Sequence, residues 1–370
     1  MWDRLKTEEK PIVLYGTGDA AEKILKELDA RDIRASGIFA SDGFVRDREF
    51  AGFKVMSYAE ACRRFGSMCV LLCFGSHRPD VIENIVRISR EQVLYAPDLP
   101  VAGKGLFDRK YYLQNKDRFD AVYGMLADEQ SRLVFSKVIE YKLTGRIGPL
   151  LECCTPEEEN WMLLFDGDSE RKSGLAFLDL GAYTGDTAEL FIKLCGGKYS
   201  HIIAVEPEKR NFRKLSENLS VFDGIELIQA AAGSADRPIT IEKGKGRGGQ
   251  ACQAEPGMAA IQVEPYEQRI AARNSSPHGI SIMQKSVDSI LKGSPVDIIK
   301  MDIEGAESDA IEGAAKTIRT HHPRMLIAAY HRTEDLYAIP EKVLSISPGY
   351  KLFLRKDPCI PAWGVNYIFV

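Results

Sequence analysis

Short apolar runs alternate with amphipathic segments along the first hundred residues. The run IVLYGTG (12–18) predicts a strand that enters a glycine turn. Residues 19–32 have helical spacing and predict one apolar face, made of Ala21, Ile24, Leu25 and Leu28. The runs IRASGIFASD, MCVLLCFGS and QVLYAPD predict further strands. This alternation predicts a small parallel α/β domain over residues 1–102.

The pattern changes to helices over residues 103–170. In LADEQSRLVFSKVIEYKLTGR, Asp128 is placed to cap a helix and Gly145 to end it. In TPEEENWMLLF, Thr155 is expected as the cap and Pro156 as the first helical residue, followed by three glutamates. We interpret this stretch as a connector that packs two domains together.

Strand patterns resume over residues 171–370. The predicted strands are GLAFLDL, HIIAVEP, IELIQAA, VDIIKMD, RMLIAAYH, YKLFLRK and VNYIFV. An insert between the third and the fourth contains GRGGQACQ and two β-like runs, PITIEKG and AAIQVEP.

Composition narrows the function classes. The 370 residues predict two or three domains. A net charge of −4 gives no electrostatic footprint for nucleic acid or for an anionic membrane surface. The chain has no apolar run of membrane-spanning length and no signal-peptide pattern. Eight scattered cysteines without a CxxC pair favour reduced thiols in a cytoplasmic protein. The sequence leaves open whether the chain forms a homo-oligomer.

The stretch FLDLGAYTGDTAELF places an acid and two glycines at the end of a buried strand. Gly181 and Gly185 let the turn approach a ligand closely, and Asp179 needs a partner if it is buried. A tight structural turn is the simpler alternative. Glu206, at the end of the next strand, can accept the hydroxyls of a ribose. Together the two strands indicate an adenosine-type ligand.

The turn favours S-adenosylmethionine over NAD. A dinucleotide site uses GxGxxG to seat a pyrophosphate at a helix N-terminus, whereas this turn reads G-A-Y-T-G-D. Asp186 would repel a pyrophosphate, but it can accept a hydrogen bond from the ammonium group of a methionine moiety.

Acids crowd the corner after the fourth strand, in IIKMDIEGAESDAIEGA. Lys300 and Asp302 point to one side of that strand, and a buried lysine is rare without a partner or a role. Asp302, Glu304 and Glu307 raise one another's pKa unless a cation lies among them. Alternatively, Glu307 decorates a first helical turn.

The fifth strand, RMLIAAYH, ends in His331. If the fourth and fifth strands are neighbours, His331 lies beside Asp302. A histidine at the carboxyl edge of the sheet, next to an acid, suits a general base or a metal ligand.

Five stretches, DLGAYTGDT, AVEPEKRNFRKLSENL, SVDSIL, IIKMDIEGAESDAIEGA and AAYHRTEDLYAIP, resemble in order and spacing the FkbM family of S-adenosylmethionine-dependent methyltransferases. The resemblance implies a class I methyltransferase fold, Rossmann-like, with a seven-stranded mostly parallel sheet. It also implies O-methylation of a hydroxyl, in a sugar, a glycan or a secondary metabolite.

The resemblance also assigns residues by position. It implies that the methionine and ribose of the cofactor lie along Asp179, Gly181, Tyr183, Thr184, Gly185 and Asp186. Glu206 and Pro207 would hold the ribose, and Gln229 and Ala230 would lie near the adenine. Asp302, Glu304 and His331 would face the acceptor, with Asp302 also bordering the cofactor.

The N-terminal domain is similar to small Rossmann-like domains that bind nucleotides or sugar nucleotides. Gly16 and Gly18 fit the approach of a phosphate, and Asp42 could hold a ribose. The alternative is a docking domain that binds nothing.

These residues suggest a mechanism. His331 would be the base, Asp302 would orient it or the acceptor, and Lys300 would steady the acids. In an alternative form of this mechanism, Asp302, Glu304 and His331 hold Mg²⁺ or Mn²⁺. Two rival functions remain: an NAD(P)-linked oxidoreductase that uses the N-terminal glycine turn, and a non-catalytic nucleotide-sugar-binding module.

Overall fold

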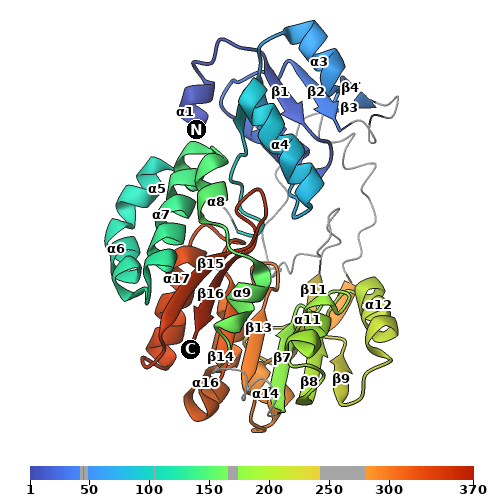
Figure 1. Cartoon of the computed structure of the whole chain (residues 1–370), viewed down its shortest axis with the longest axis vertical. Coiled ribbons are helices and arrows are strands. Elements are labelled where there is room, and N and C mark those ends of the chain that lie inside the picture. Colours follow the sequence, from blue (N-terminus) through green and yellow to red (C-terminus); the bar gives the residue numbers. More distant parts are fainter. Residues whose placement is uncertain (42–44, 46–48, 104, 166–173, 242–279) are drawn as a thin grey trace, which may run out of the picture. The chain divides into compact units, whose positions relative to one another are not determined.

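The computed structural model describes residues 1–370 except 42–44, 46–48, 104, 166–173 and 242–279 (Figure 1). Packing divides the chain into two compact units. One unit joins Met1–Arg171 with Pro323–Val370, and the other is Lys172–His322. The expected division at residues 102 and 170 stays a prediction. Within the described ranges, no helix is long and apolar enough to cross a bilayer.

The first unit begins with a short helix and a six-stranded sheet in the order β3-β4-β2-β1-β5-β6. The sheet is parallel except at β3. Its elements in chain order are α1 (Trp2–Leu5), β1 (Ile12–Tyr15), α2 (Asp19–Asp29), β2 (Gly37–Ala40), β3 (Glu49–Phe50), β4 (Phe53–Ser57), α3 (Tyr58–Phe65), β5 (Cys69–Leu72), α4 (Pro79–Glu91) and β6 (Val93–Tyr95). The predicted parallel α/β pattern is confirmed, but the strands β3 and β4 and the helices α1, α3 and α4 have no counterpart among the predicted elements.

Local sequence explains how this sheet is built. Leu14, Ile24 and Leu71 share one buried core, so β1 and β5 pack against α2. Ser57 ends β4 and starts α3 through a capping box with Glu60, in which each side chain accepts from the other residue's backbone N–H. Strand β4 therefore ends in a defined helix start at the carboxyl edge of the sheet.

A helical segment follows the sheet. Its helices are α5 (Arg109–Gln114), α6 (Lys116–Met125), α7 (Glu129–Thr144), α8 (Gly148–Cys153) and α9 (Glu157–Met162). The predicted ends of α7 are confirmed, because Asp128 accepts from the Ser131 N–H and Gly145 is left-handed with φ 69°. The predicted cap at Thr155 is wrong. Pro156 is the N-cap, and the Thr155 hydroxyl bonds instead to the side chain of Asn160.

Three C-terminal strands complete this unit. β14 (Arg324–Ala328), β16 (Val365–Phe369) and β15 (Leu352–Lys356) pair antiparallel in that order, and α17 (Asp335–Ile346) precedes β15. Helix α7 packs on β15, where Ser131 Oγ accepts from the Leu354 N–H at 2.9 Å and Asp128 pairs with Arg355 at 2.5 Å.

The second unit carries a parallel sheet in the order β13-β7-β8-β9 (Figure 1). Its strands are β7 (Leu175–Leu180), β8 (Tyr199–Val205), β9 (Ile225–Ile228) and β13 (Ile298–Met301). Its helices are α11 (Asp186–Leu194), α12 (Lys209–Leu219), α14 (Val287–Leu291), α15 (Glu307–Gly313) and α16 (Ala315–His321). Each strand lies where the apolar pattern predicts it.

A small three-stranded sheet joins the same unit, with β12 (Ile280–Lys285) between β10 (Ala231–Ala232) and β11 (Arg237–Ile241). β11 corresponds to the first half of the predicted run PITIEKG. The predicted runs GRGGQACQ and AAIQVEP lie outside the described residues. A single sheet of seven strands would join both units and stays a prediction.

Candidate functional site

The candidate site begins at the glycine turn that follows β7. Gly181 has φ 80°, and a Cβ placed on it would lie 1.9 Å from the carbonyl oxygen of Asp302. The backbone of Asp302 is held there because its N–H donates to the Leu180 carbonyl at 3.1 Å. A side chain at position 181 would therefore force apart the ends of β7 and β13, so the turn requires glycine for this close approach.

A buried ion pair lies beneath this turn. Asp179 is completely buried, and its carboxylate lies 3.1 Å from the Lys300 ammonium. Lys300 also donates to the Gly181 carbonyl at 2.9 Å. Burial pulls the pKa of Lys300 down, but the charges of Asp179 and Asp302 outweigh burial and raise it. Lys300 therefore links the buried acid to the backbone of the turn.

Glu206 follows β8, and its carboxylate is held by backbone amides. One oxygen accepts from the Tyr183 N–H at 3.0 Å, and the other accepts from the Glu208 N–H at 2.9 Å and from the Asn211 amide at 3.4 Å. Burial raises the pKa of Glu206, while the Glu208 and Tyr183 N–H groups oppose that rise. A carboxylate offers about four acceptor positions, so the oxygen facing Tyr183 can accept one more donor.

The remaining predicted cofactor residues surround this edge. Tyr183 is left-handed with φ 47° and 37% exposed. Gly185 caps α11, and a Cβ there would touch Leu219 at 3.1 Å. The Thr184 carbonyl accepts from the Asn218 amide. Asp186 is exposed at the start of α11, and Pro207 is half-buried after β8. After β9, Gln229 is exposed and Ala230 is buried. The unit thus brings the predicted residues of β7, β8 and β9 to one sheet edge.

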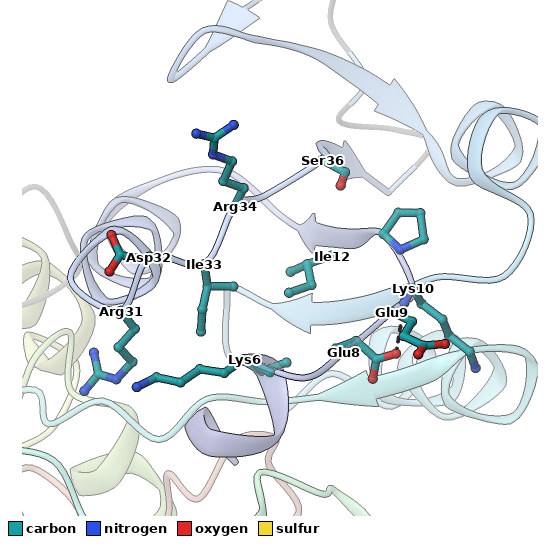
Figure 2. A pocket seen from close by; sticks show the side chains of 12 residues that line it. Lys6, Glu8, Glu9, Lys10, Ile12, Arg31, Asp32, Ile33, Arg34 and Ser36 are labelled. Carbon is teal, nitrogen blue, oxygen red and sulfur yellow. Dashed lines mark hydrogen bonds between the residues drawn. The ribbon is translucent and has the colours of Figure 1, made fainter.

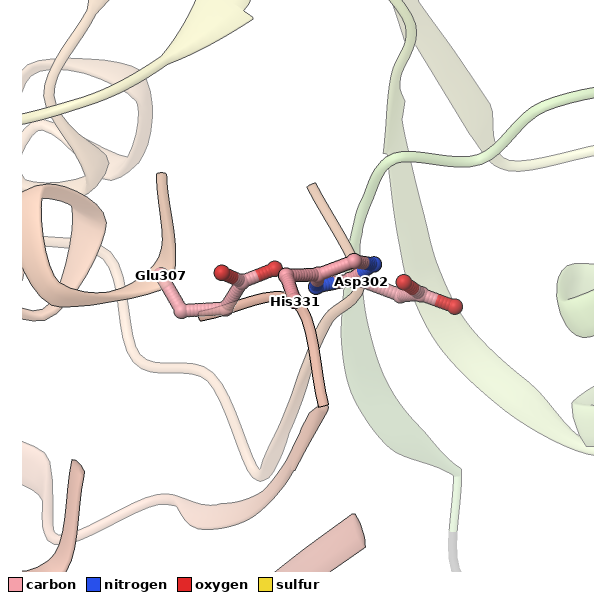
Figure 3. A group of neighbouring side chains, drawn as sticks. All are labelled: Asp302, Glu307 and His331. Atoms are coloured by element: carbon pink, nitrogen blue, oxygen red, sulfur yellow. The ribbon is translucent and has the colours of Figure 1, made fainter. Parts of the chain in front are cut away.

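The corner after β13 carries the acidic cluster. Asp302 and Glu307 each place a carboxylate oxygen within 4.8 Å of the other (Figure 3). Glu307 is buried and accepts from the Ile303 N–H at 2.9 Å, which favours its structural interpretation. Glu304 is half-buried and left-handed with φ 57°, as the sharp corner requires.

His331, the third side chain labelled in Figure 3, belongs to the first unit. It follows β14, is 1% exposed, and its ring centre lies 4.1 Å from that of Tyr330. Its carbonyl accepts from the Ala102 N–H at 2.9 Å. The predicted grouping of His331 with Asp302 and Glu304 draws on both units and stays a prediction.

The predicted second nucleotide site is only partly described. Gly16 has φ 109°, and a Cβ there would lie 2.6 Å from the Phe74 ring, so Phe74 covers the turn at that residue. A Cβ placed on Gly18, by contrast, would meet no described atom within 4 Å. Asp42 lies outside the described residues.

A cavity of about 500 Å³ opens at the amino ends of β1 and β2 (Figure 2). Its lining mixes basic and acidic side chains: Lys6, Lys10, Arg31, Arg34, Glu8, Glu9 and Asp32. This is the edge opposite the one where open α/β sheets bind ligands. We assign it no role in the reaction.

Two contacts of the candidate site were not predicted from the sequence. Asn211 supports Glu206 from α12, and the Lys300 ammonium reaches the Gly181 carbonyl. The rarity of a buried lysine indicated a partner for Lys300, whereas the sequence held no signal for Asn211.

The geometry fits an adenosine-bearing sulfonium donor. The Gly181 turn exposes backbone beside an acid that retains an acceptor position, as a ribose hydroxyl requires. Asp186 adds an exposed carboxylate at the start of α11.

Comparisons with known proteins agree. The model of the methyltransferase FkbM domain matches residues 179–347. The chain is similar to the crystal structure of a methyltransferase FkbM from Methylobacillus flagellatus KT, with a TM-score of 0.68, 19% identity, and coverage of 98% of this chain and 90% of that one. An rRNA methylase from Streptococcus thermophilus covers 58% of this chain and 95% of its own, at 12% identity and a TM-score of 0.34, too distant for any inference. No curated protein sequence matches the chain at a significant level.

The crystal structure shares the α/β fold over nearly the whole chain, and the family match coincides with the glycine turn, Glu206 and the acidic corner. Residues 179–347 therefore match the methyltransferase FkbM domain, and the chain is an S-adenosylmethionine-dependent methyltransferase.

Proposed function

We propose that the chain transfers a methyl group from S-adenosylmethionine to a hydroxyl oxygen of a sugar, a glycan or a secondary metabolite. The observation that carries the proposal is the family match over residues 179–347, which begins at Asp179 and includes the acidic corner. The scattered cysteines without a CxxC pair are our reason for placing the reaction in the cytoplasm.

The residues of β7 and β8 hold the donor in this proposal. Glu206 accepts a ribose hydroxyl at its remaining acceptor position, and the Gly181 turn lies against the sugar and methionine parts. Asp186 accepts from the methionine ammonium, and the backbone near Gln229 and Ala230 borders the adenine. Asp179 and Lys300 act from below as positioning residues, because Asp179 is completely buried.

The acceptor needs proton removal, since a neutral hydroxyl is a weak nucleophile. His331 takes that proton as the acceptor oxygen bonds to the methyl carbon and the carbon–sulfur bond of the donor breaks. Asp302 orients the imidazole or the acceptor. In the alternative, Asp302, Glu304 and His331 would hold a divalent cation, Mg²⁺ or Mn²⁺, which would supply Lewis-acid polarisation of the hydroxyl.

The test has two stages. Calorimetry with S-adenosylmethionine should show binding that Glu206→Ala weakens at least about tenfold, the effect of losing a hydrogen bond to a charged group. The matched control, Glu226→Ala, removes an exposed glutamate of β9 and should leave affinity unchanged. Failure of the wild type to bind the donor would end the proposal.

The second stage is a methyl-donor assay read by mass spectrometry across glycans, nucleotide sugars and polyketide-like alcohols. His331→Ala should lower turnover about 10²–10⁴-fold with donor affinity intact, whereas the exposed control His77→Ala should not. Full turnover of His331→Ala would remove the base assignment. Turnover that survives a chelator would remove the cation.

A further inference from the structure

The N-terminal sheet carries a second cavity, at the edge opposite the one in Figure 2. It measures about 240 Å³ and is lined by Tyr15, Ser41, Tyr58, Ala59, Asn84, Arg87 and Ile88. Tyr15 ends β1, Ser41 follows β2, and Tyr58 begins the helix after β4. The cavity therefore lies at the carboxyl ends of three neighbouring parallel strands, where open α/β sheets bind ligands.

The strand order places this cavity beside a topological switch point. The chain runs from β1 outward to β2 and β4, and then returns to β5 on the other side of β1. The crevice between β1 and β5 is filled, because the Phe74 ring packs edge-on against Tyr15 with centroids 4.8 Å apart and covers Gly16. Space for a ligand remains on the β2 side.

A chain of hydrogen bonds lines the cavity. The Tyr15 hydroxyl lies 2.7 Å from Ser41 Oγ and accepts from the Asn84 amide at 3.0 Å. The Asn84 carbonyl accepts from Arg87, which fixes the orientation of the amide. Tyr15 and Ser41 share one hydroxyl hydrogen between them, so one hydroxyl hydrogen and one amide hydrogen remain for a ligand. The wall therefore offers two donors.

The charges of the lining are already paired. Arg87 donates to Glu91 at 2.7 Å, and Tyr58 donates to the same carboxylate at 2.7 Å. The Arg87 guanidinium also lies 5.2 Å from the centre of the Tyr58 ring. A charged group such as a phosphate would meet an already neutralised cation. A neutral ligand with hydrogen-bond acceptors suits this wall better.

We propose that this cavity binds the base of a nucleoside. A base is neutral, carries carbonyl or ring-nitrogen acceptors for the two donors, and lies flat beside Tyr58 and Ile88. The volume is below the range of about 300–1,000 Å³ for drug-sized ligands, so the cavity holds one ring system and not a dinucleotide.

The experiment is calorimetry of the full chain with uridine and with adenosine, each with and without saturating S-adenosylhomocysteine. We expect saturable binding of at least one nucleoside, retained in the presence of S-adenosylhomocysteine. Ala59→Phe fills the cavity without removing a bond and should weaken binding at least tenfold. Ala121→Phe, an exposed alanine of α6, is the matched control and should leave affinity unchanged.

Ser41→Ala provides a second readout that does not depend on the larger substitution being tolerated. It removes one hydrogen-bonding hydroxyl and should weaken binding about 3- to 10-fold. The proposal is overturned if neither nucleoside binds, or if S-adenosylhomocysteine displaces it. It is equally overturned if Ala59→Phe, folded by circular dichroism, and Ser41→Ala both bind as the wild type does. Failure of the methyl-donor assay would leave this result unaffected.

Discussion

Replacing Lys300 by methionine tests how the methyltransferase unit holds its glycine turn. Methionine keeps the length of the side chain but removes the ammonium, which lies 3.1 Å from Asp179 and donates to the Gly181 carbonyl. The substitution leaves a completely buried carboxylate without its cation and a backbone carbonyl without its donor. Both losses fall directly beneath the turn that we expect to bind the donor.

The expected loss of stability is large. Removing one partner of a buried ion pair costs about 3–5 kcal/mol, because the other charge is left buried. An orphaned carbonyl alone costs about 1–3 kcal/mol. The double variant Asp179→Asn/Lys300→Met has no buried charge at this position, so it should lose only about the second amount. A coupling free energy of about 2 kcal/mol or more should therefore appear in the double-mutant cycle.

Urea unfolding followed by circular dichroism measures the cycle, and calorimetry with S-adenosylmethionine measures the turn. We expect Lys300→Met to weaken donor binding at least tenfold. Lys214→Met, an exposed lysine of α12, is the matched control and should change neither quantity. If Lys300→Met stays within about 1 kcal/mol of the wild type, or the double variant costs the sum of the singles, Lys300 does not hold the turn in this way.

Three further predictions concern local structure. Gly181→Ala combines a left-handed φ with a Cβ 1.9 Å from a backbone oxygen, so urea unfolding should show a loss above about 3 kcal/mol and donor binding should disappear. Ser57→Ala removes the capping box of α3 and should cost about 1 kcal/mol, unlike Ser67→Ala at an exposed bend. Burial acts to raise the pKa of Asp128, but the bonds to Arg355 and Ser131 outweigh burial and lower that pKa to about 2. The ionised Asp128 therefore stabilises the fold above about pH 4, and this contribution is lost as the pH falls toward 2. Asp128 is 34% exposed, so Asp128→Asn should lower the free energy of unfolding at pH 7 by only about 1–2 kcal/mol, measured by urea unfolding. The substitution should also reduce the loss of stability between pH 4 and pH 2.

The sequence predicted the elements whose signals are local. Asp128 and Gly145 mark the ends of α7, because a cap and a left-handed glycine act within one turn of the helix. Thr155 failed as a cap because its hydroxyl found a partner in Asn160, and the helix begins at Glu157 instead. Strand β3 has two residues and lies at the sheet edge, too short to carry an apolar pattern, and only two of the five residues of its neighbour β4 are buried.

The sequence placed the candidate residues at strand ends, but it predicted few of their contacts. An acid at the end of an apolar strand identified Glu206, and two glycines identified the turn. The backbone amides that hold Glu206 belong to residues chosen by chain geometry and leave no mark on side-chain identity. From the sequence, Glu307 could belong to the acidic cluster or to a first helical turn, and its bond to the Ile303 N–H favours the second interpretation.

The two glycine turns of this chain show why a motif alone does not decide a function. Each turn follows the first strand of a parallel sheet, and each lies beside a strand that the chain reaches later: β5 beside β1, and β13 beside β7. Beyond β5 comes Phe74, whose ring covers Gly16, whereas beyond β13 comes Asp302, whose backbone meets Gly181 and whose carboxylate is half-buried at the sheet edge. The neighbouring strand therefore decides what each turn can bind, because it supplies either a ring that excludes a ligand or an acid that can face one. At the sheet edge that we propose for the methyl donor, the turn stays beside an acid, whereas in the N-terminal sheet the space for a ligand lies on the side of Ser41 and Asn84.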